Sequence, residues 1–155
     1  MRRKDREITD FHKMIEILKA CDCCRIGLID EDEAYIVPMN FGYEIADGSL
    51  ILYFHCAKEG RKVELIPKQK YVSFEMDTRH SLVEGEMGCD FSCLYQSIMG
   101  KGTMEIIKEK EEKISGLKKM MKHYTAKEDW EFKPEYIERL YVLKLSVIEW
   151  SCKEH

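Results

Sequence analysis

The chain has 155 residues, 45% of them hydrophobic and 35% charged, a composition that supports one domain, residues 1–155, and excludes disorder and low complexity. Its 25 Lys and Arg residues against 29 Asp and Glu residues give a net charge of −4, which argues against a dedicated nucleic-acid binder. The best apolar run, Leu50–Phe54, ends at His55, and no apolar segment follows the basic amino terminus, so we expect a cytoplasmic protein with no membrane span.

The first half of the chain is predicted to hold one helix and three strands. Residues 10–21 repeat apolar side chains at helical spacing. Strand-like patterns follow over 24–29, 34–43 and 49–55, and Asp47-Gly48 between the last two is a strong hairpin signal. Because parallel neighbours need long crossover connections, the short turns predict an antiparallel three-stranded meander.

The second half is predicted to alternate helices with strands. Its patterns indicate helices over 58–67 and 109–124 and from Pro134, and strands over 71–76, 92–107 and 140–150, with a poorly patterned stretch over 78–91. Most strands follow one another through hairpins. The predicted fold class is therefore α+β, with about six antiparallel strands in a barrel or sheet and with peripheral helices.

Pro38 falls within the second predicted strand. Proline has no N–H to donate to a neighbouring strand, so it is confined to edges and bulges. An ordinary sheet edge explains this residue. The alternative is that a ligand lies alongside this strand in place of a neighbouring strand.

The segment from His55 to Lys62 combines features that suit a phosphate group. It lies where a strand ends and a helix begins, so backbone N–H groups are free to bind an anion. Gly60 allows a ligand to approach the backbone closely, and Arg61 and Lys62 add two cations. An ordinary solvated charge pair is the alternative. The chain has no Walker loop, because Gly100-Lys101-Gly102-Thr103 lacks the upstream glycine of that motif.

Three segments together carry a resemblance to a known family: Pro38-Met39-Asn40-Phe41-Gly42-Tyr43, Leu52-Tyr53-Phe54-His55-Cys56-Ala57-Lys58-Glu59-Gly60-Arg61-Lys62, and Tyr95-Gln96-Ser97-Ile98-Met99-Gly100-Lys101-Gly102. In order and spacing they resemble the nitroimidazole-resistance branch of the pyridoxamine 5'-phosphate oxidase-like flavoproteins. The likeness runs from about Arg3 to Lys153, and the opening segment Met1–Glu7 is also similar to that branch.

The resemblance implies a split β-barrel homodimer with FMN bound at the subunit interface. The residues that it assigns to FMN are Val37, Pro38, Met39 and Asn40 along the ring, His55 and Ala57 beside the ring and ribityl chain, Lys58, Gly60, Arg61 and Lys62 at the phosphate, and Gln96 and Ser97 on the long strand of this chain or its partner.

The activity that the resemblance implies is that of an FMN-dependent oxidoreductase. Its substrate would be a small organic acceptor, with nitroaromatic compounds among the candidates. In that branch a histidine at the position of His55 lies beside the flavin and the substrate, and the ordinary histidine pKa of about 6.5 suits proton delivery. A histidine bonded to backbone at the end of a strand is the alternative.

Two other classes of function stay open. One is a non-catalytic protein of the same fold that binds or senses flavin or haem. The other is a thiol or zinc module, since the seven cysteines include Cys21-Asp22-Cys23-Cys24 and Cys89-Asp90-Phe91-Ser92-Cys93. Structural zinc sites use paired cysteine knuckles on turns, and free cysteines are more often buried as small hydrophobic residues, so we expect no metal site.

Overall fold

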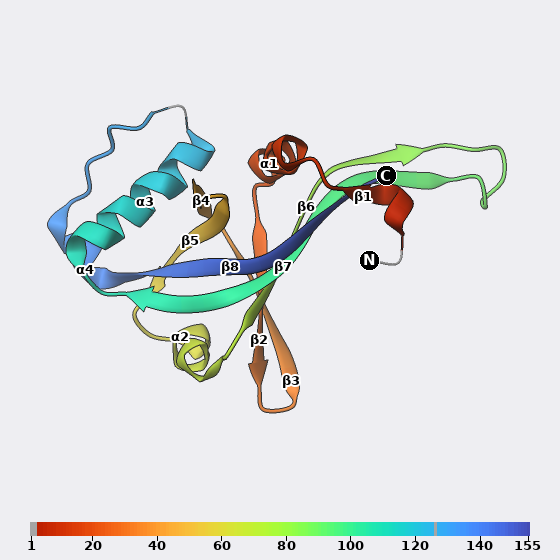
Figure 1. Cartoon of the computed structure of the whole chain (residues 1–155). Helices are drawn as coiled ribbons and strands as arrows, with labels where there is room; N and C mark the ends of the chain where they lie inside the picture. Colours follow the sequence, from red (N-terminus) through yellow and green to blue (C-terminus); the bar gives the residue numbers. More distant parts are fainter. Residues whose placement is uncertain (1–2, 126) are drawn as a thin grey trace.

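A single antiparallel sheet with helices around it dominates the computed structural model, which describes residues 3–125 and 127–155 (Figure 1). Met1 and Arg2, which open the segment that resembles the family, lie outside the described residues. The strands are β1 (Glu7–Ile8), β2 (Cys24–Asp30), β3 (Glu33–Met39), β4 (Gly42–Ala46), β5 (Ser49–Ala57), β6 (Val72–Val83), β7 (Ser92–Ile107) and β8 (Leu140–Glu154). The helices are α1 (Phe11–Ala20), α2 (Arg61–Leu65), α3 (Lys110–Tyr124) and α4 (Pro134–Arg139), with short 3-10 turns at Lys4–Arg6 and Ile66–Lys68.

The strand order is β3-β2-β6-β7-β8-β5-β4, with β1 paired to β8. The strands β3 and β4, consecutive in the chain, therefore lie at opposite edges of the sheet, and the predicted three-stranded meander is wrong. The cause is Phe41, which is fully buried and whose backbone N–H donates a hydrogen bond to the Tyr124 hydroxyl of α3 (3.1 Å). The chain leaves the sheet to bury this ring, so the strand expected over 34–43 divides into two.

The described chain has eight strands where about six were expected. Besides the division of 34–43, the two-residue strand β1 is too short to give a pattern. Strand β6 also continues beyond the predicted end at residue 76, to Val83. Its register shifts between Thr78 and Ser81, where Arg79 has a φ of 54°. That irregularity breaks the alternation of apolar residues that marks a half-buried strand. Figure 1 shows the resulting β6–β7 hairpin extending away from the other elements.

The two faces of β5 belong to two different clusters. Leu50, Leu52 and Phe54 are buried in the main core, beneath α1 and between the strands. Tyr53, on the opposite face, packs with α3, α4 and β8 in a second cluster. Because side chains alternate along a strand, His55 lies on the face that α3 covers, two residues beyond Tyr53.

The helix predicted over 58–67 is shorter than expected. Gly60 has a φ of 122°, outside the helical range, so α2 begins only at Arg61 and ends in the 3-10 turn Ile66–Lys68. Residues 58–60 instead form a bend between β5 and α2. Among the described residues, no helix combines the length and the apolar character that crossing a membrane requires.

Candidate functional site

The structure brings Asn40 and His55 together at one end of the β4–β5 hairpin. Asn40 lies in the connection between β3 and β4, and His55 lies near the end of β5. Both residues line a cavity of about 330 Å³ whose other walls come from α3 and from residues 132–136. Two of the predicted site residues thus open onto a common space.

The His55 side chain is solvent-accessible, but protein atoms around it still affect its protonation. Partial burial lowers the pKa of His55 below its ordinary value, and the positive charge of Lys62 lowers it further. The imidazole is therefore neutral at neutral pH. A neutral imidazole donates one N–H and accepts at its other nitrogen, so it can form a hydrogen bond to a polar ligand group.

Gly60 and Lys62 leave room for an anion after β5. No atom lies within 4 Å of the position where a Cβ of Gly60 would be, so the backbone there is open to a ligand. Lys62 has no ion-pair partner among the described residues and lies close enough to His55 to shift its pKa. Ala57 and Lys58 are exposed beside them.

Arg61, the second predicted phosphate cation, points to a different partner. Its Nε donates to Asp30 Oδ2 (2.5 Å), and its Nη2 is 3.8 Å from Glu33. The guanidinium also lies 4.6 Å from the ring centre of Tyr35. The acidic turn between β2 and β3 thus already neutralises Arg61. Its role at a phosphate stays a prediction, and it would require exchange of these contacts.

Val37, Pro38 and Met39 lie at the end of the edge strand β3. Pro38 is exposed and opposite Arg25 of β2, on a strand that has no second neighbour among the described residues. The edge interpretation of Pro38 is confirmed. A ligand along the open side of β3 stays a prediction.

Gln96 and Ser97 lie in the middle of the sheet on β7. The amide nitrogen of Gln96 donates to a carboxylate oxygen of Glu154, but its Oε1 is buried without a hydrogen-bond partner among the described residues. The residue is only 6% exposed and lines a hollow of about 290 Å³ with Arg79, Tyr95 and His155. Buried polar atoms nearly always have a partner, so this oxygen is a candidate contact for a ligand N–H.

Two groups of predicted site residues, one around His55 and one around Gln96, are far apart within one chain. Strand β8 pairs with both: Val142 lies opposite His55, and Glu154 lies opposite Gln96. Twelve residues of β8 separate these partners, which corresponds to about 40 Å of extended strand. One FMN molecule is shorter than this distance, so a single chain does not bring both groups to one flavin.

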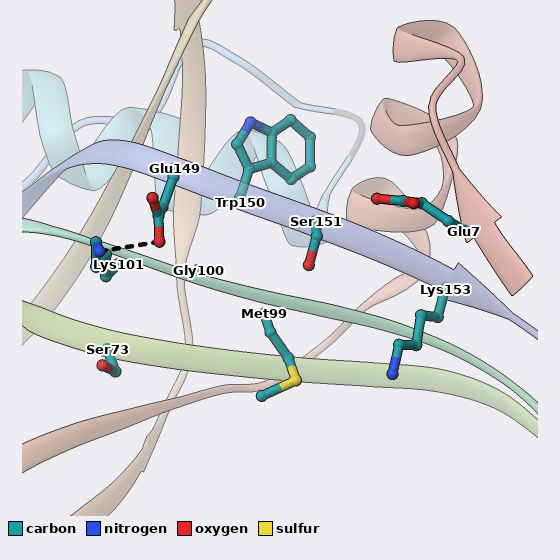
Figure 2. A pocket seen from close by; sticks show the side chains of 9 residues that line it. All are labelled: Glu7, Ser73, Met99, Gly100, Lys101, Glu149, Trp150, Ser151 and Lys153. Carbon is teal, nitrogen blue, oxygen red and sulfur yellow. Dashed lines mark ion pairs between the residues drawn. The ribbon is translucent and has the colours of Figure 1, made fainter. Parts of the chain in front are cut away.

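Another hollow, of about 470 Å³, lies on the open face of β6, β7 and β8. Figure 2 shows its lining: Glu7, Ser73, Met99, Gly100, Lys101, Glu149, Trp150, Ser151 and Lys153. Lys101 pairs with Glu149 across it (2.9 Å). None of the predicted site residues lines this hollow, and its lining carries side chains of both charges.

The cysteines do not gather into a centre. Within the described residues, no group of three or more His, Cys, Asp or Glu side chains is arranged to hold a metal ion. Burial raises the pKa of Cys21 and of Cys152 to about 12, and Cys24 is also buried with a raised pKa. Such thiols are protonated and unreactive at neutral pH. Cys21, Cys24 and Cys152 are therefore buried, unreactive thiols, whereas Cys89 and Cys93 are exposed.

Sequence reasoning missed most of the cavity beside His55. Met120 and Met121 fall within the helix predicted over 109–124, and Phe132 lies just before the helix predicted from Pro134, but the sequence did not assign these residues to a site. Tyr136 follows Pro134 in the short helix α4 and is 57% exposed. Two features of the sequence could have indicated this cavity. One is the pair of aromatic residues Phe132 and Tyr136, and the other is the pair of consecutive methionines in the preceding helix.

Comparisons with known proteins identify the family and support the fold. A family model described as pyridoxamine 5'-phosphate oxidase matches residues 11–153. A solved structure from Bacteroides thetaiotaomicron, named for 5-nitroimidazole antibiotic resistance, is 32% identical, with 96% of this chain and 86% of that chain covered and a TM-score of 0.81. A comparison with curated proteins finds no match.

Two further solved structures share the fold at lower identity. The flavocytochrome Anf3 from Azotobacter vinelandii is 22% identical, with 100% of this chain and 72% of that chain covered and a TM-score of 0.82. The FAD and heme binding protein from Mycobacterium smegmatis is 16% identical, with 96% and 73% covered and a TM-score of 0.76. At these identities the likeness concerns the fold alone.

Proposed function

Because this chain belongs to the pyridoxamine 5'-phosphate oxidase family, we propose that it is a flavoprotein that binds FMN between two protomers and reduces a small organic acceptor. The observation that carries the proposal is the β5–α2 junction. There His55 opens onto an apolar cavity, and the open backbone at Gly60 and the unpaired Lys62 follow within seven residues. The relatives named for nitroimidazole resistance, for a flavocytochrome and for FAD and heme binding add support.

Two of the predicted contacts with a flavin are possible in the structure as it stands, and a third requires a side chain to change its partner. The unpartnered Gln96 Oε1 can accept from a ring N–H, and Lys62 with Gly60 can hold a phosphate. Arg61 can join them only by exchanging its contact with Asp30. A phosphate brings enough negative charge to compete for this guanidinium.

Bound FMN supplies the transfer of two electrons between reductant and acceptor. Lys62 balances the phosphate charge, and residues 37–40 offer the backbone of an edge strand to the ring. His55, neutral at neutral pH, holds a hydrogen bond to the acceptor and delivers a proton when it is protonated. The apolar walls of the cavity lie on one side of His55.

The separation of the two residue groups supports the proposal of a homodimer. If His55 of one protomer and Gln96 of the other face the same flavin, neither chain needs to span the roughly 40 Å of β8 between them. The hollow of Figure 2 continues into another of about 300 Å³ through shared residues Ser73 and Met99. Ile36 and Met99, 63% and 56% exposed on this surface, are apolar side chains that a second copy would cover.

The test is the composition of the purified protein. We expect a yellow protein whose released small molecule has the mass of FMN, bound at one molecule per protomer, and a dimer by light scattering. A released haem or FAD would contradict the choice of FMN. A monomer that still holds FMN would contradict the shared site.

A second measurement tests catalysis. The bound flavin is reduced under anaerobic conditions, and its reoxidation is followed after a nitroaromatic compound is added. Reoxidation in proportion to the added acceptor is the expected result. A flavin that stays reduced with every acceptor would favour the non-catalytic alternative.

A further inference from the structure

Lys113 of α3 is the only charged residue that is buried in the described part of the chain, with an exposed fraction of 5%. Its Nζ donates to the main-chain carbonyl oxygens of Ile137 (3.1 Å) and Leu140 (2.8 Å), where α4 ends and β8 begins. An ammonium group carries three N–H donors, so one of them has no acceptor among the described residues. Lysine is rarely buried without a charged partner, so this side chain is a candidate for a role beyond packing.

The charge of Lys113 is not neutralised by a carboxylate. Among the described residues, its hydrogen bonds go to two carbonyl oxygens, and neither carries a net charge. Burial lowers the pKa of Lys113, the positive charge of Lys58 lowers it further, and Glu138 opposes these shifts in part. The protonated form of Lys113 is therefore less stable than that of a lysine in water, and an anion nearby would stabilise it.

Lys113 lies beside the end of β5, where the predicted phosphate site begins. Leu140, whose carbonyl it binds, is paired with Ala57, the last residue of β5. The ring of Tyr141, the next residue of β8, has Lys58 Nζ 5.7 Å and Lys113 Nζ 5.6 Å from its centre. A buried cation from α3 and an exposed cation that follows β5 therefore meet at one aromatic ring.

The β5–α2 junction offers this pair of cations an anion site. Lys58 and Lys62 flank Gly60, whose backbone is open to a ligand. In the part of the chain that the structure describes, the ion pairs of the junction belong to Arg61 alone, so neither lysine is neutralised. Charges interact over about 8–10 Å in physiological salt, and covered charges are screened less than exposed ones. Lys113 can therefore act on an anion at the junction without contacting it.

We propose that Lys113 is a positioning residue of the phosphate site: held by the carbonyls of Ile137 and Leu140, its covered positive charge stabilises the phosphate of the ligand at the β5–α2 junction. The inference rests on the proposed function for the place of the phosphate. It goes beyond that function, because the family resemblance assigns no residue of α3 to the cofactor.

The first test compares FMN with riboflavin, which lacks the phosphate. Lys113→Met removes the charge and also the hydrogen bonds to Ile137 and Leu140, so the ratio of the two dissociation constants separates the two effects. Fluorescence titration of the flavin-free protein measures both constants. We expect the variant to bind FMN about fivefold more weakly and riboflavin as tightly as the parent does. An equal loss for both flavins, or unchanged FMN binding, overturns the proposal.

Two further variants control for net charge and for the fold. Lys118→Met removes one positive charge from the exposed face of the same helix, and it should leave both affinities unchanged. Lys113→Arg keeps the charge, and it should keep the preference of the parent for FMN over riboflavin. A loss of that preference in Lys118→Met as large as in Lys113→Met would mean that the net charge of the molecule is responsible, and would overturn the role of Lys113.

Inorganic phosphate separates this proposal from the flavin assignment. An anion that binds the folded chain raises its Tm, and the purified protein is heated in phosphate and in chloride of equal ionic strength. Phosphate should raise the Tm of the parent and of Lys118→Met, and raise that of Lys113→Met less. This pattern in a protein that binds neither flavin would contradict the proposed function and support the role of Lys113. The same rise in Lys113→Met as in the parent, or no rise in the parent, would overturn that role whether or not flavin binds.

Discussion

Lys62 and Arg61 are adjacent in the chain, yet their surroundings differ. Arg61 is held by Asp30 and stacked on Tyr35, whereas Lys62 has no ion pair among the described residues. The sequence analysis predicted that both cations hold the phosphate. It could not anticipate the difference, because Asp30 lies 31 positions away in the chain and only the fold brings its turn to α2.

Replacing Lys62 by Met should weaken FMN binding about tenfold or more. A charge-assisted contact to a phosphate contributes roughly 1.5–3 kcal/mol, and Lys62 is the cation that needs no rearrangement to make it. Fluorescence titration of the flavin-free protein measures the affinity. Riboflavin, which lacks the phosphate, should bind the variant and the parent equally, and Lys68→Met serves as a surface control. An equal loss for FMN and riboflavin would refute the phosphate contact.

The pH profile of turnover tests the role of His55. Burial and Lys62 lower the pKa of His55 below 6.5, so the protonated form grows only as the pH falls below that value. If His55 delivers the proton, turnover should rise as the pH falls from about 7.5 to about 5.5. His55→Gln should retain flavin and lose that rise. The same profile in parent and variant would exclude His55 as the proton donor.

At the scale of elements, the contact between α3 and β4 shapes the cavity. A Cβ on Gly42 would lie 2.3 Å from the Met120 backbone nitrogen and 2.5 Å from its Cα, so the helix backbone rests directly on this strand. The sequence predicted α3 over 109–124, but it placed Gly42 at the end of the strand expected over 34–43 and did not predict β4. It did not predict their contact, because a glycine that permits close packing looks the same as a glycine in a turn.

Gly42→Ala should therefore lower the free energy of unfolding by about 1–3 kcal/mol, since α3 must move away to admit the methyl group. Denaturant unfolding measures the effect. Gly88→Ala is the matched control, because no atom lies within 4 Å of the position of its Cβ. Equal stability of the two variants would contradict the packing described here.

The main error of the sequence prediction at the scale of elements is the single strand expected over 34–43, which the structure divides into β3 and β4. Phe41 continues the apolar pattern of a strand, and nothing local distinguishes it from its neighbours. Its burial in the core and its backbone hydrogen bond to Tyr124, 83 residues away, are tertiary contacts. Tertiary packing overrides local propensity at such positions.

For the whole molecule, the predicted α+β split barrel is confirmed by the sheet topology and by the structural relatives. Alternating patterns and hairpin turns were enough for the fold class, because they depend on local periodicity. The ends of β6 and β8 were not predictable in this way. The bulge after Thr78 interrupts one pattern, and the last residues of β8 pair with β1 and β7 although their own sequence is polar.

The long separation of His55 from Gln96 along β8 has a consequence for hybrid dimers. In a symmetric dimer with shared sites, a protomer carrying His55→Gln and one carrying Gln96→Ala would combine both lesions in one site and leave the other site intact. If each lesion abolishes turnover in the site that carries it, the two variants, unfolded together and refolded as an equimolar mixture, should regain about a quarter of the parent's activity, because half of the dimers are hybrids with one working site of two. Recovery of activity would therefore show that each site uses residues of both chains. No recovery would mean that each chain forms its site alone.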